Sequence, residues 1–321
     1  MRIALVTPAR AGSRTGNRHT ALRWAAMLRA QGHKVTVATE WLPDEKTDLL
    51  LALHARRSHA SIKQFAQTHP TRPVVLALTG TDVYRDIKTS KEAKESLELA
   101  TRFIVLQPKA IEQLPKRLRP KASVVYQSCS TKLKHRPVKR TFRLSVIGHL
   151  REEKDPLRAL AALRYLPADL NIELIQVGES LDDALAAEAR RGMRRDPRYR
   201  WLGGVPHSRA LRLLASSHAM VISSRMEGGA NVVSEAMRIG VPVLASRISG
   251  NIGLLGADYP GYYPPGDERA LGALIMRAAT KPRFYRELKA RIGKLRPMVA
   301  PENEARMLRR SIGEVSRTAR A

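Results

Sequence analysis

Two glutamates with seven residues between them, Glu227 and Glu235, lie in a segment whose pattern is strand, glycine-bearing turn and helix. The apolar residues 219–223 predict the strand, and Gly228 and Gly229 predict the turn. Backbone N–H groups in such a turn and the positive end of the helix dipole favour an anion. Two carboxylates would repel a simple phosphate, but they can accept hydrogen bonds from hydroxyls on both sides of a diphosphate. The pattern therefore indicates a nucleotide sugar as ligand.

A second segment of the same kind lies upstream, at residues 144–156. Its apolar strand runs into Gly148, and Asp155 with Pro156 predicts the start of a helix, as cap and first helical residue. Lys154 lies just before that start. Taken alone, Lys154 is an ordinary solvated lysine and the two glutamates are ordinary helix-flanking carboxylates. The pairing of the two motifs favours the functional interpretation.

These motifs resemble the donor site of retaining glycosyltransferases of family 4. The Glu-x7-Glu motif is followed by Ala236-Met237 and by Gly240-Val241-Pro242, as in that family, and Gly148 and Lys154 match the upstream motif. His149 stands where the family usually has arginine, and a neutral histidine does not supply the fixed charge of an arginine.

The resemblance implies a GT-B fold, in which two Rossmann-like α/β domains with parallel sheets face each other across a cleft. It implies catalytic roles for Lys154 and Glu227, with Glu235 on the ribose and Glu227 facing the sugar. Arg151 and Arg225 are both candidates for the second phosphate contact. No metal and no cofactor are expected. The implied donor-binding residues are Gly148, His149, Arg151, Lys154, Gly204, Val205, Glu227, Gly228, Gly229, Ala230, Asn231, Val232 and Glu235.

Short apolar strands alternate with helical patterns along the chain, which predicts parallel sheets with ligands beyond the carboxyl ends of the strands. The predicted strands are 3–7, 35–39, 49–53, 74–78, 103–106, 123–126, 144–147, 172–177, 199–202, 220–223 and 243–245. A polar stretch at 128–141 predicts a linker. We expect an acceptor-side domain at 1–135, onto which a helix at 303–321 packs back, and a donor domain at 136–302.

The chain carries a net charge of +28, and its first 140 residues contain 27 basic and 10 acidic residues. A basic surface of this kind can bind nucleic acid, but the positive residues are scattered and no nucleic-acid-binding module is present. We expect no specific nucleic-acid partner. No apolar run approaches a membrane span, and residue 1 leads directly into a strand, which predicts a cytoplasmic protein.

Three loops at the predicted carboxyl edge of the first sheet are rich in hydrogen-bonding and basic residues. The first follows strand 3–7 and opens a helix, where free N–H groups and guanidiniums suit a small oxyanion. The others follow strands 49–53 and 74–78. The residues expected to bind the acceptor are Arg14, Thr15, Gly16, Asn17, Arg18, Arg56, Thr79, Gly80, Thr81 and Asp82. Asn17, Arg18 and His54 are expected to take part in the reaction.

These loops, together with the segment 148–156, resemble one subfamily, the selenosugar synthases of selenoneine biosynthesis. The resemblance implies transfer of selenium from selenophosphate to the anomeric carbon of a UDP-sugar, typically UDP-N-acetylglucosamine, with release of UDP and phosphate. Other enzymes of selenoneine biosynthesis are possible partners. Two alternatives stay open: a conventional family 4 glycosyltransferase with a hydroxyl acceptor, and a non-enzymatic basic nucleotide-binding protein.

Overall fold

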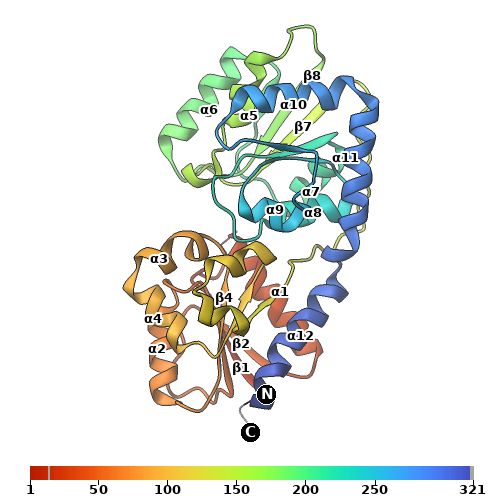
Figure 1. Cartoon of the computed structure of the whole chain (residues 1–321). Helices are drawn as coiled ribbons and strands as arrows, with labels where there is room; N and C mark the ends of the chain where they lie inside the picture. Colours follow the sequence, from red (N-terminus) through yellow and green to blue (C-terminus); the bar gives the residue numbers. More distant parts are fainter. Residues whose placement is uncertain (14, 319–321) are drawn as a thin grey trace. The chain divides into compact units, whose positions relative to one another are not determined.

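The computed structural model describes residues 1–13 and 15–318, and the chain divides into two compact units (Figure 1). The first comprises Met1–Gln127 with Pro301–Ala321, and the second comprises Ser128–Ala300. The second unit begins earlier than the predicted boundary between residues 135 and 136, because the predicted linker is hydrogen-bonded into it. The backbone N–H of Cys129 donates to the carbonyl of Val299, and that of His135 donates to the carbonyl of Ile239, each at 3.2 Å.

The first unit is built on a six-stranded parallel sheet with the order β2-β1-β3-β4-β5-β6. Its strands are β1 (Arg2–Val6), β2 (Lys34–Ala38), β3 (Leu49–Leu53), β4 (Val74–Leu78), β5 (Arg102–Val105) and β6 (Ala122–Val124). Its helices are α1 (Gly16–Ala30), α2 (His59–Thr68), α3 (Ile87–Thr89), α4 (Lys91–Leu99) and α12 (Pro301–Thr318). Shorter helical turns are η1 (Asp82–Asp86), η2 (Pro108–Gln113) and η3 (Lys116–Lys121).

Both faces of this sheet are covered, so its central strands are apolar throughout. Every residue of β3 and of β4 is buried. On one face Leu50 packs in a cluster with Trp41 and Phe65. On the other face Leu51 packs in a cluster with Trp24. Strands buried on both faces read as continuous apolar runs rather than as alternating ones, which is the pattern of these segments.

Helix α12 comes last in the chain but packs on α1 within the first unit (Figure 1). Leu308 is completely buried in the cluster that contains Trp24. Glu304 is also completely buried, and its carboxylate accepts hydrogen bonds from Arg23 Nε at 2.8 Å and from Trp24 Nε1 at 2.7 Å. A buried carboxylate is tolerated when it is paired in this way, so the contact fixes the position of α12 on α1.

We expect Glu304→Ala to lower the free energy of unfolding by about 3 kcal/mol, because it leaves the Arg23 guanidinium and the Trp24 indole without their buried acceptor. Chemical unfolding followed by circular dichroism measures the change. Glu302→Ala is the matched control, since Glu302 lies in the same helical turn with an exposed side chain, and it should cost about 1 kcal/mol or less. Equal losses in the two variants would contradict the role of the buried pair.

The second unit also contains a six-stranded parallel sheet, with the order β12-β11-β10-β7-β8-β9. Its strands are β7 (Phe142–Ile147), β8 (Ile172–Val177), β9 (Tyr199–Trp201), β10 (Ala219–Ile222), β11 (Val243–Ser246) and β12 (Tyr262–Tyr263). Its helices are α5 (Arg158–Ala162), α6 (Asp183–Arg195), α7 (His207–Ser216), α8 (Asn231–Ile239), α9 (Ser249–Leu255), α10 (Glu268–Thr280) and α11 (Pro282–Leu295). Shorter turns are η4 (Glu152–Lys154), η5 (Leu163–Tyr165) and η6 (Arg296–Val299).

In each sheet, the side on which successive strands are added changes at one strand. In the first unit β1 lies between β2 and β3, and in the second unit β7 lies between β8 and β10. Ligands of open parallel sheets bind beyond the carboxyl ends of the strands at such a reversal point. The fold therefore directs attention to the loops after β1 and β3 in one unit, and to the loops after β7 and β10 in the other.

Every strand predicted from the sequence is present, with small shifts at the ends. The prediction missed β12, because its two residues are too short to show a period. The predicted helix start at Asp155 and Pro156 is wrong. Asp155 adopts a left-handed backbone with φ 44° after the turn η4, and α5 begins only at Arg158. The Asp155 carboxylate accepts a hydrogen bond from Arg158 Nε at 2.9 Å instead of capping the backbone.

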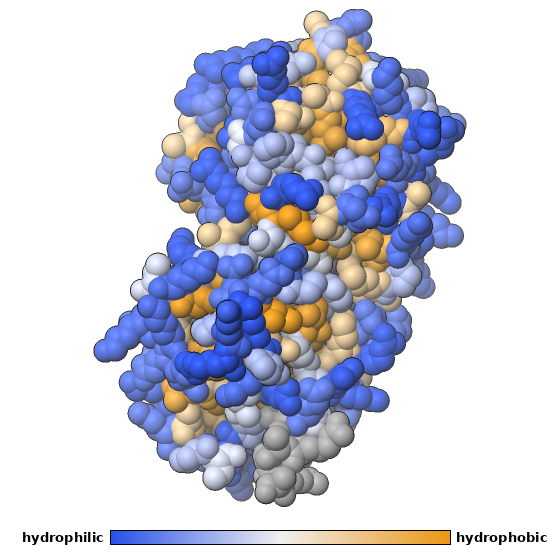
Figure 2. Space-filling model, viewed as in Figure 1, coloured by the Kyte–Doolittle hydropathy of each residue, from blue (hydrophilic) through white to orange (hydrophobic). Residues whose placement is uncertain are grey.

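Hydrophilic side chains cover most of the visible face of each unit, and apolar side chains form smaller patches between them (Figure 2). Among the residues that the structure describes, no helix is long and apolar enough to cross a membrane.

Candidate functional site

The turns after β7 and β10 bring Lys154 and Glu227 into contact. Lys154 Nζ donates a hydrogen bond to Glu227 Oε1 as part of an ion pair. Ser224, two residues after β10, donates from its hydroxyl to the same carboxylate oxygen at 2.6 Å. The backbone N–H of Arg225 donates to the carbonyl of Glu153 at 2.9 Å, which joins the two turns a second time. Two residues that lie 73 positions apart in the chain thus form one charged cluster at the reversal point of the sheet.

The turn that contains Glu227 is supported by residues that were not predicted from the sequence. The side chain of Glu227 is 8% exposed. The hydroxyl of Ser246 donates to the carbonyl of Ser224 at 2.6 Å, which braces the turn. A Cβ atom on Gly250 would lie 2.1 Å from the Glu227 carbonyl oxygen, so only glycine lets the first turn of α9 approach this closely. Ser224 could have been inferred from its place three residues before Glu227, whereas nothing in the sequence marks Gly250.

A cavity of about 30 Å³ lies beside this cluster, and it is lined by both turns and by the first residues of α8. Gly148, His149, Lys154, Glu227 and Val232 are among its lining residues. The backbone N–H groups in the first turn of a helix have no acceptor within the helix, so the start of α8 adds donors and partial positive charge to the cavity. His149 Nδ1 is buried and has no hydrogen-bond partner in the described part of the chain.

The predicted helix after the glycine turn is α8, which begins at Asn231 with Ala230 as its N-cap. Glu235 lies one turn into this helix, and its Oε1 is 2.8 Å from Nε2 of His207, the first residue of α7. The hydrogen bond to Glu235 raises the pKa of His207 above its ordinary value of 6.5. His207 has no signal in the sequence, because 28 positions separate it from Glu235 and no motif connects the two.

We expect the pair of His207 and Glu235 to stabilise the second unit at low pH only. Because the pKa of His207 is raised in the folded chain, the contribution is complete below about pH 6.5 and is lost as the pH rises through the raised value. The imidazole is half exposed, so the coupling energy should be about 0.2–1 kcal/mol.

A double-mutant cycle of His207→Ala and Glu235→Gln, with unfolding measured at about pH 5.5 and about pH 8.5, isolates this term. The coupling should be present at the lower pH and absent at the higher one. A coupling energy of the same size at both would contradict the assignment.

The other predicted donor residues differ in how their side chains are engaged. Arg151 pairs with Glu153, with Nη1 at 3.4 Å from Oε1. Arg225 is exposed, and its guanidinium has no hydrogen bond or ion pair among the described residues. Gly204 and Val205 lie in the loop between β9 and α7, where Gly204 is in close contact with the side chain of Glu179. Gly228 and Gly229 form the turn before α8, as predicted.

In the first unit, His54 directly follows β3 and is the most unusual residue at the carboxyl edge. It is 3% exposed and has a left-handed backbone with φ 79°. Its Nδ1 accepts the backbone N–H of Arg57 at 3.3 Å. Its Nε2 is buried, lies 3.8 Å from Asp86 Oδ2 and has no hydrogen bond to any residue that the structure describes. Burial lowers the pKa of His54, so the neutral imidazole is favoured. Strain combined with an unsatisfied polar atom is typical of functional positions.

The loops after β3 and β4 are joined by Asp82, which is completely buried. Its carboxylate accepts the backbone N–H groups of Ala55 at 3.1 Å, Thr79 at 3.4 Å and Gly80 at 2.7 Å. These contacts occupy both carboxylate oxygens with the protein's own backbone. Asp82 therefore positions the two loops. A direct contact between Asp82 and the acceptor substrate, which the sequence predicted, does not fit these surroundings. Thr81 precedes it as the N-cap of the turn η1.

Arg56 is partly neutralised, because its Nε donates to Asp86 Oδ2 at 3.0 Å. Burial raises the pKa of Asp86, but the hydrogen bonds from Arg56 and Arg85 outweigh this effect and hold the pKa below its ordinary value. The Thr79 hydroxyl is buried and has no partner among the described residues. The edge beyond β3 and β4 thus contains an imidazole and a hydroxyl with unused hydrogen-bonding capacity.

The loop after β1 leads into α1, whose first residue is Gly16 and whose N-cap is Thr15. Asn17 and Arg18 are half-buried in the first turn, and neither side chain has a hydrogen bond or ion pair within the described ranges. Arg14 lies outside the described residues. Because β1 and β3 are neighbours in the sheet, this loop and His54 belong to the same edge of the first unit.

Comparison with known proteins agrees with this architecture. A family model described as glycosyl transferases group 1 matches residues 130–294, which is more than half of the chain. Similar solved structures include HepE from Anabaena in complex with UDP, with 17% sequence identity and a TM-score of 0.77 over 99% of this chain and 100% of that chain. Sucrose-phosphate synthase from Thermosynechococcus elongatus has 17% identity and a TM-score of 0.76 over 99% of this chain and 98% of that one.

A glycosyltransferase from Rickettsia africae is also similar, with 12% identity and a TM-score of 0.71 over 98% of both chains. The two six-stranded parallel sheets are those of the GT-B glycosyltransferase fold. The chain belongs to the group 1 family of glycosyltransferases.

Proposed function

We propose that this glycosyltransferase uses a UDP-sugar, UDP-N-acetylglucosamine in the first instance, and transfers the sugar to the selenium of selenophosphate. The observation that carries the proposal is the contrast between the two units. The second unit has the cation and carboxylates that suit a nucleotide sugar. The first unit has a polar edge with hydrogen-bond donors that suit a small anion.

The donor half rests on the cluster after β7 and β10. Lys154 and the first N–H groups of α8 provide positive charge for a diphosphate. Glu235, within α8, can accept hydrogen bonds from the ribose hydroxyls once its own hydrogen bond with His207 is broken. Glu227 can accept hydrogen bonds from the hydroxyls of the sugar. Arg225 is the better candidate for a second phosphate contact, because Arg151 is already paired with Glu153. The similar HepE structures contain UDP, UDP-glucose, or UDP and glucose, which supports a uridine nucleotide here.

The acceptor half rests on the first turn of α1 and on His54. Asn17 and Arg18 present donors that have no partner in the described part of the chain, next to a helix N-terminus, which is a suitable arrangement for a phosphate-like oxyanion. His54 is neutral and offers Nε2 as a hydrogen-bond donor, since its Nδ1 already accepts the Arg57 N–H. We assign it to positioning the acceptor, because an anionic, polarisable selenium nucleophile needs no general base.

The reaction balances without an oxidant or reductant. A Se–C bond forms at the anomeric carbon as the bond from that carbon to the diphosphate oxygen breaks, and UDP departs with the electron pair. Water then cleaves the P–Se bond, which releases phosphate and the selenosugar. Lys154 stabilises the charge that develops on the leaving UDP, so its contribution belongs to turnover as well as to binding.

Mass spectrometry of the products from UDP-N-acetylglucosamine, with and without selenophosphate, tests the proposal. We expect a selenium-containing sugar and stoichiometric UDP only when both substrates are present, and Arg18→Ala should raise the Michaelis constant for selenophosphate at least about tenfold, because it removes a charge-assisted contact. Arg10→Ala is the matched control, since Arg10 is an exposed arginine of the same loop, and it should leave the constant unchanged.

Other outcomes would reject the proposal in distinct ways. Transfer to a hydroxyl acceptor, with no selenium product, would show a conventional glycosyltransferase. Nucleotide binding without UDP release under any acceptor would show a binding protein. If Arg18→Ala weakens UDP binding and leaves the dependence on selenophosphate intact, the loop after β1 serves the donor instead.

A further inference from the structure

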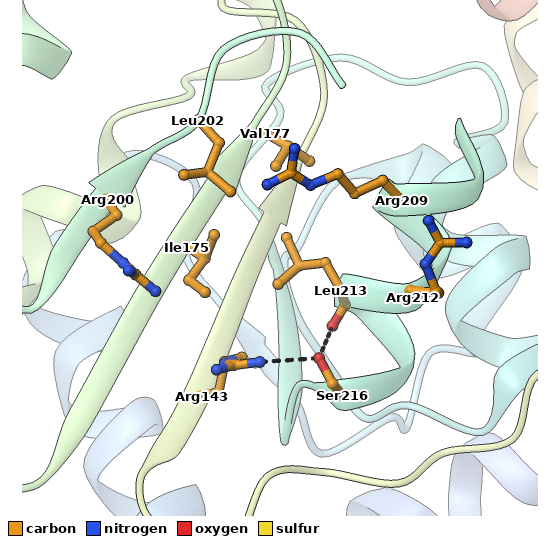
Figure 3. Close-up of a pocket in the computed structure, with 9 residues that line it drawn as sticks. All are labelled: Arg143, Ile175, Val177, Arg200, Leu202, Arg209, Arg212, Leu213 and Ser216. Carbon is orange, nitrogen blue, oxygen red and sulfur yellow. Dashed lines mark hydrogen bonds between the residues drawn. The ribbon is translucent and has the colours of Figure 1, made fainter. Parts of the chain in front are cut away.

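A pocket of about 430 Å³ lies in the second unit between α7 and the strands β8 and β9. This volume is in the range of ordinary small-molecule sites. Figure 3 shows Arg209 extending from α7 across the strands towards Val177 and Leu202, while Arg143 lies with Ser216 at the opposite end. None of the residues that line this pocket also lines the cavity at Lys154 and Glu227. Its lining residues are Arg143, Ile175, Val177, Arg200, Leu202, Arg209, Arg212, Leu213 and Ser216.

The pocket combines an apolar floor with a cationic rim. Ile175 and Val177 of β8, which are 3% and 2% exposed, form the buried base of the floor. Leu202, which is 40% exposed, and the half-buried Leu213 are its accessible apolar side chains. The arginines come from two strands, β7 and β9, and from α7, so their guanidiniums surround the floor from several sides (Figure 3). A site of this composition favours a molecule that has an apolar body and at least one anionic group.

The positive charge at the pocket is not balanced by the protein. Glu173 is the acidic residue at the pocket, and it is shared, with Oε2 accepting from Arg143 Nε at 2.7 Å and Oε1 accepting from Arg200. Arg209 and Arg212 have no ion pair or side-chain hydrogen bond within the described part of the chain. The segment 190–212 contains eight arginines and one acidic residue, Asp196, which pairs with Arg198. An anion in the pocket would relieve this repulsion.

Protection of an edge strand explains only part of this charge. Strand β9 is at the edge of the sheet, and an exposed charge such as that of Arg200 prevents pairing with another chain. Arg209 and Arg212 lie on α7 rather than on the edge strand, and Arg143 lies on β7, in the interior of the sheet. Their convergence on one apolar floor has no role in protecting the edge.

We propose that this pocket is a second ligand site, which binds a small amphiphilic anion with its apolar body on Leu202 and Leu213 and its anionic group on Arg209 and Arg212. A free small molecule fits better than a membrane surface, because the floor lies below the arginine rim, where a flat surface does not reach. The site does not depend on the proposed donor and acceptor, since its residues belong to neither cluster.

Titration of the full chain with the fluorescent probe 8-anilinonaphthalene-1-sulfonate, with and without saturating UDP, tests this site. We expect saturable binding that UDP does not displace, and about tenfold weaker binding in the double variant Arg209→Ala/Arg212→Ala, because two charge-assisted contacts are lost. The matched control is Arg283→Ala/Arg286→Ala, in which two exposed arginines, also three residues apart on a helix and without described partners, are removed from α11. The control should bind the probe like the parent chain.

Three results would overturn the proposal. Equal weakening in both double variants would show diffuse attraction to a basic surface. Complete displacement of the probe by UDP would place it at the nucleotide cluster. An unchanged affinity in Arg209→Ala/Arg212→Ala, with an unchanged melting temperature, would show that the probe binds elsewhere.

Discussion

The ion pair between Lys154 and Glu227 is the contact on which the carboxyl edge of the second unit depends. A carboxylate that is 8% exposed is costly unless it is paired and hydrogen-bonded, and Lys154 and Ser224 together meet that requirement. Lys154 follows β7, while Ser224 and Glu227 follow β10. The pair can form because the sheet order makes these strands neighbours. The left-handed backbone of Asp155 then directs the chain towards α5. Gly250 has no side chain, so α9 can approach the backbone of Glu227 closely.

A buried carboxylate has the same structural task in the first unit. Asp82 joins the loops after β3 and β4 by accepting three backbone N–H groups. Next to this junction, His54 has a left-handed backbone, and its Nε2 has no hydrogen-bond partner among the described residues. In both units, then, a buried acid fixes two loops at a strand edge and leaves polar groups beside it with unused capacity. Such fixed groups can stabilise charge without reorganisation, which is what a transferase needs at the point of reaction.

Much of this architecture could be predicted from the sequence, because strands buried on both faces leave a clear signal. The run Leu49–Leu53 and the Glu-x7-Glu segment identified their elements almost to the residue. The failures have physical causes. The two-residue β12 has no period to detect, and Asp155 resembles a helix cap although its carboxylate binds Arg158. His207 and Asp82 take their roles from contacts distant in the chain or from backbone groups, neither of which a motif records.

The most direct test of the account is the affinity for UDP and for uridine, measured by calorimetry on the parent chain and on Lys154→Met/Glu227→Gln. The double variant removes both charges, so no unpaired buried ion is left to destabilise the fold. If Lys154 is the diphosphate contact at the reversal point of the second sheet, UDP affinity should fall about tenfold or more while uridine affinity stays the same. An unchanged affinity for UDP would contradict the account, because the charged cluster would then have no part in holding the nucleotide.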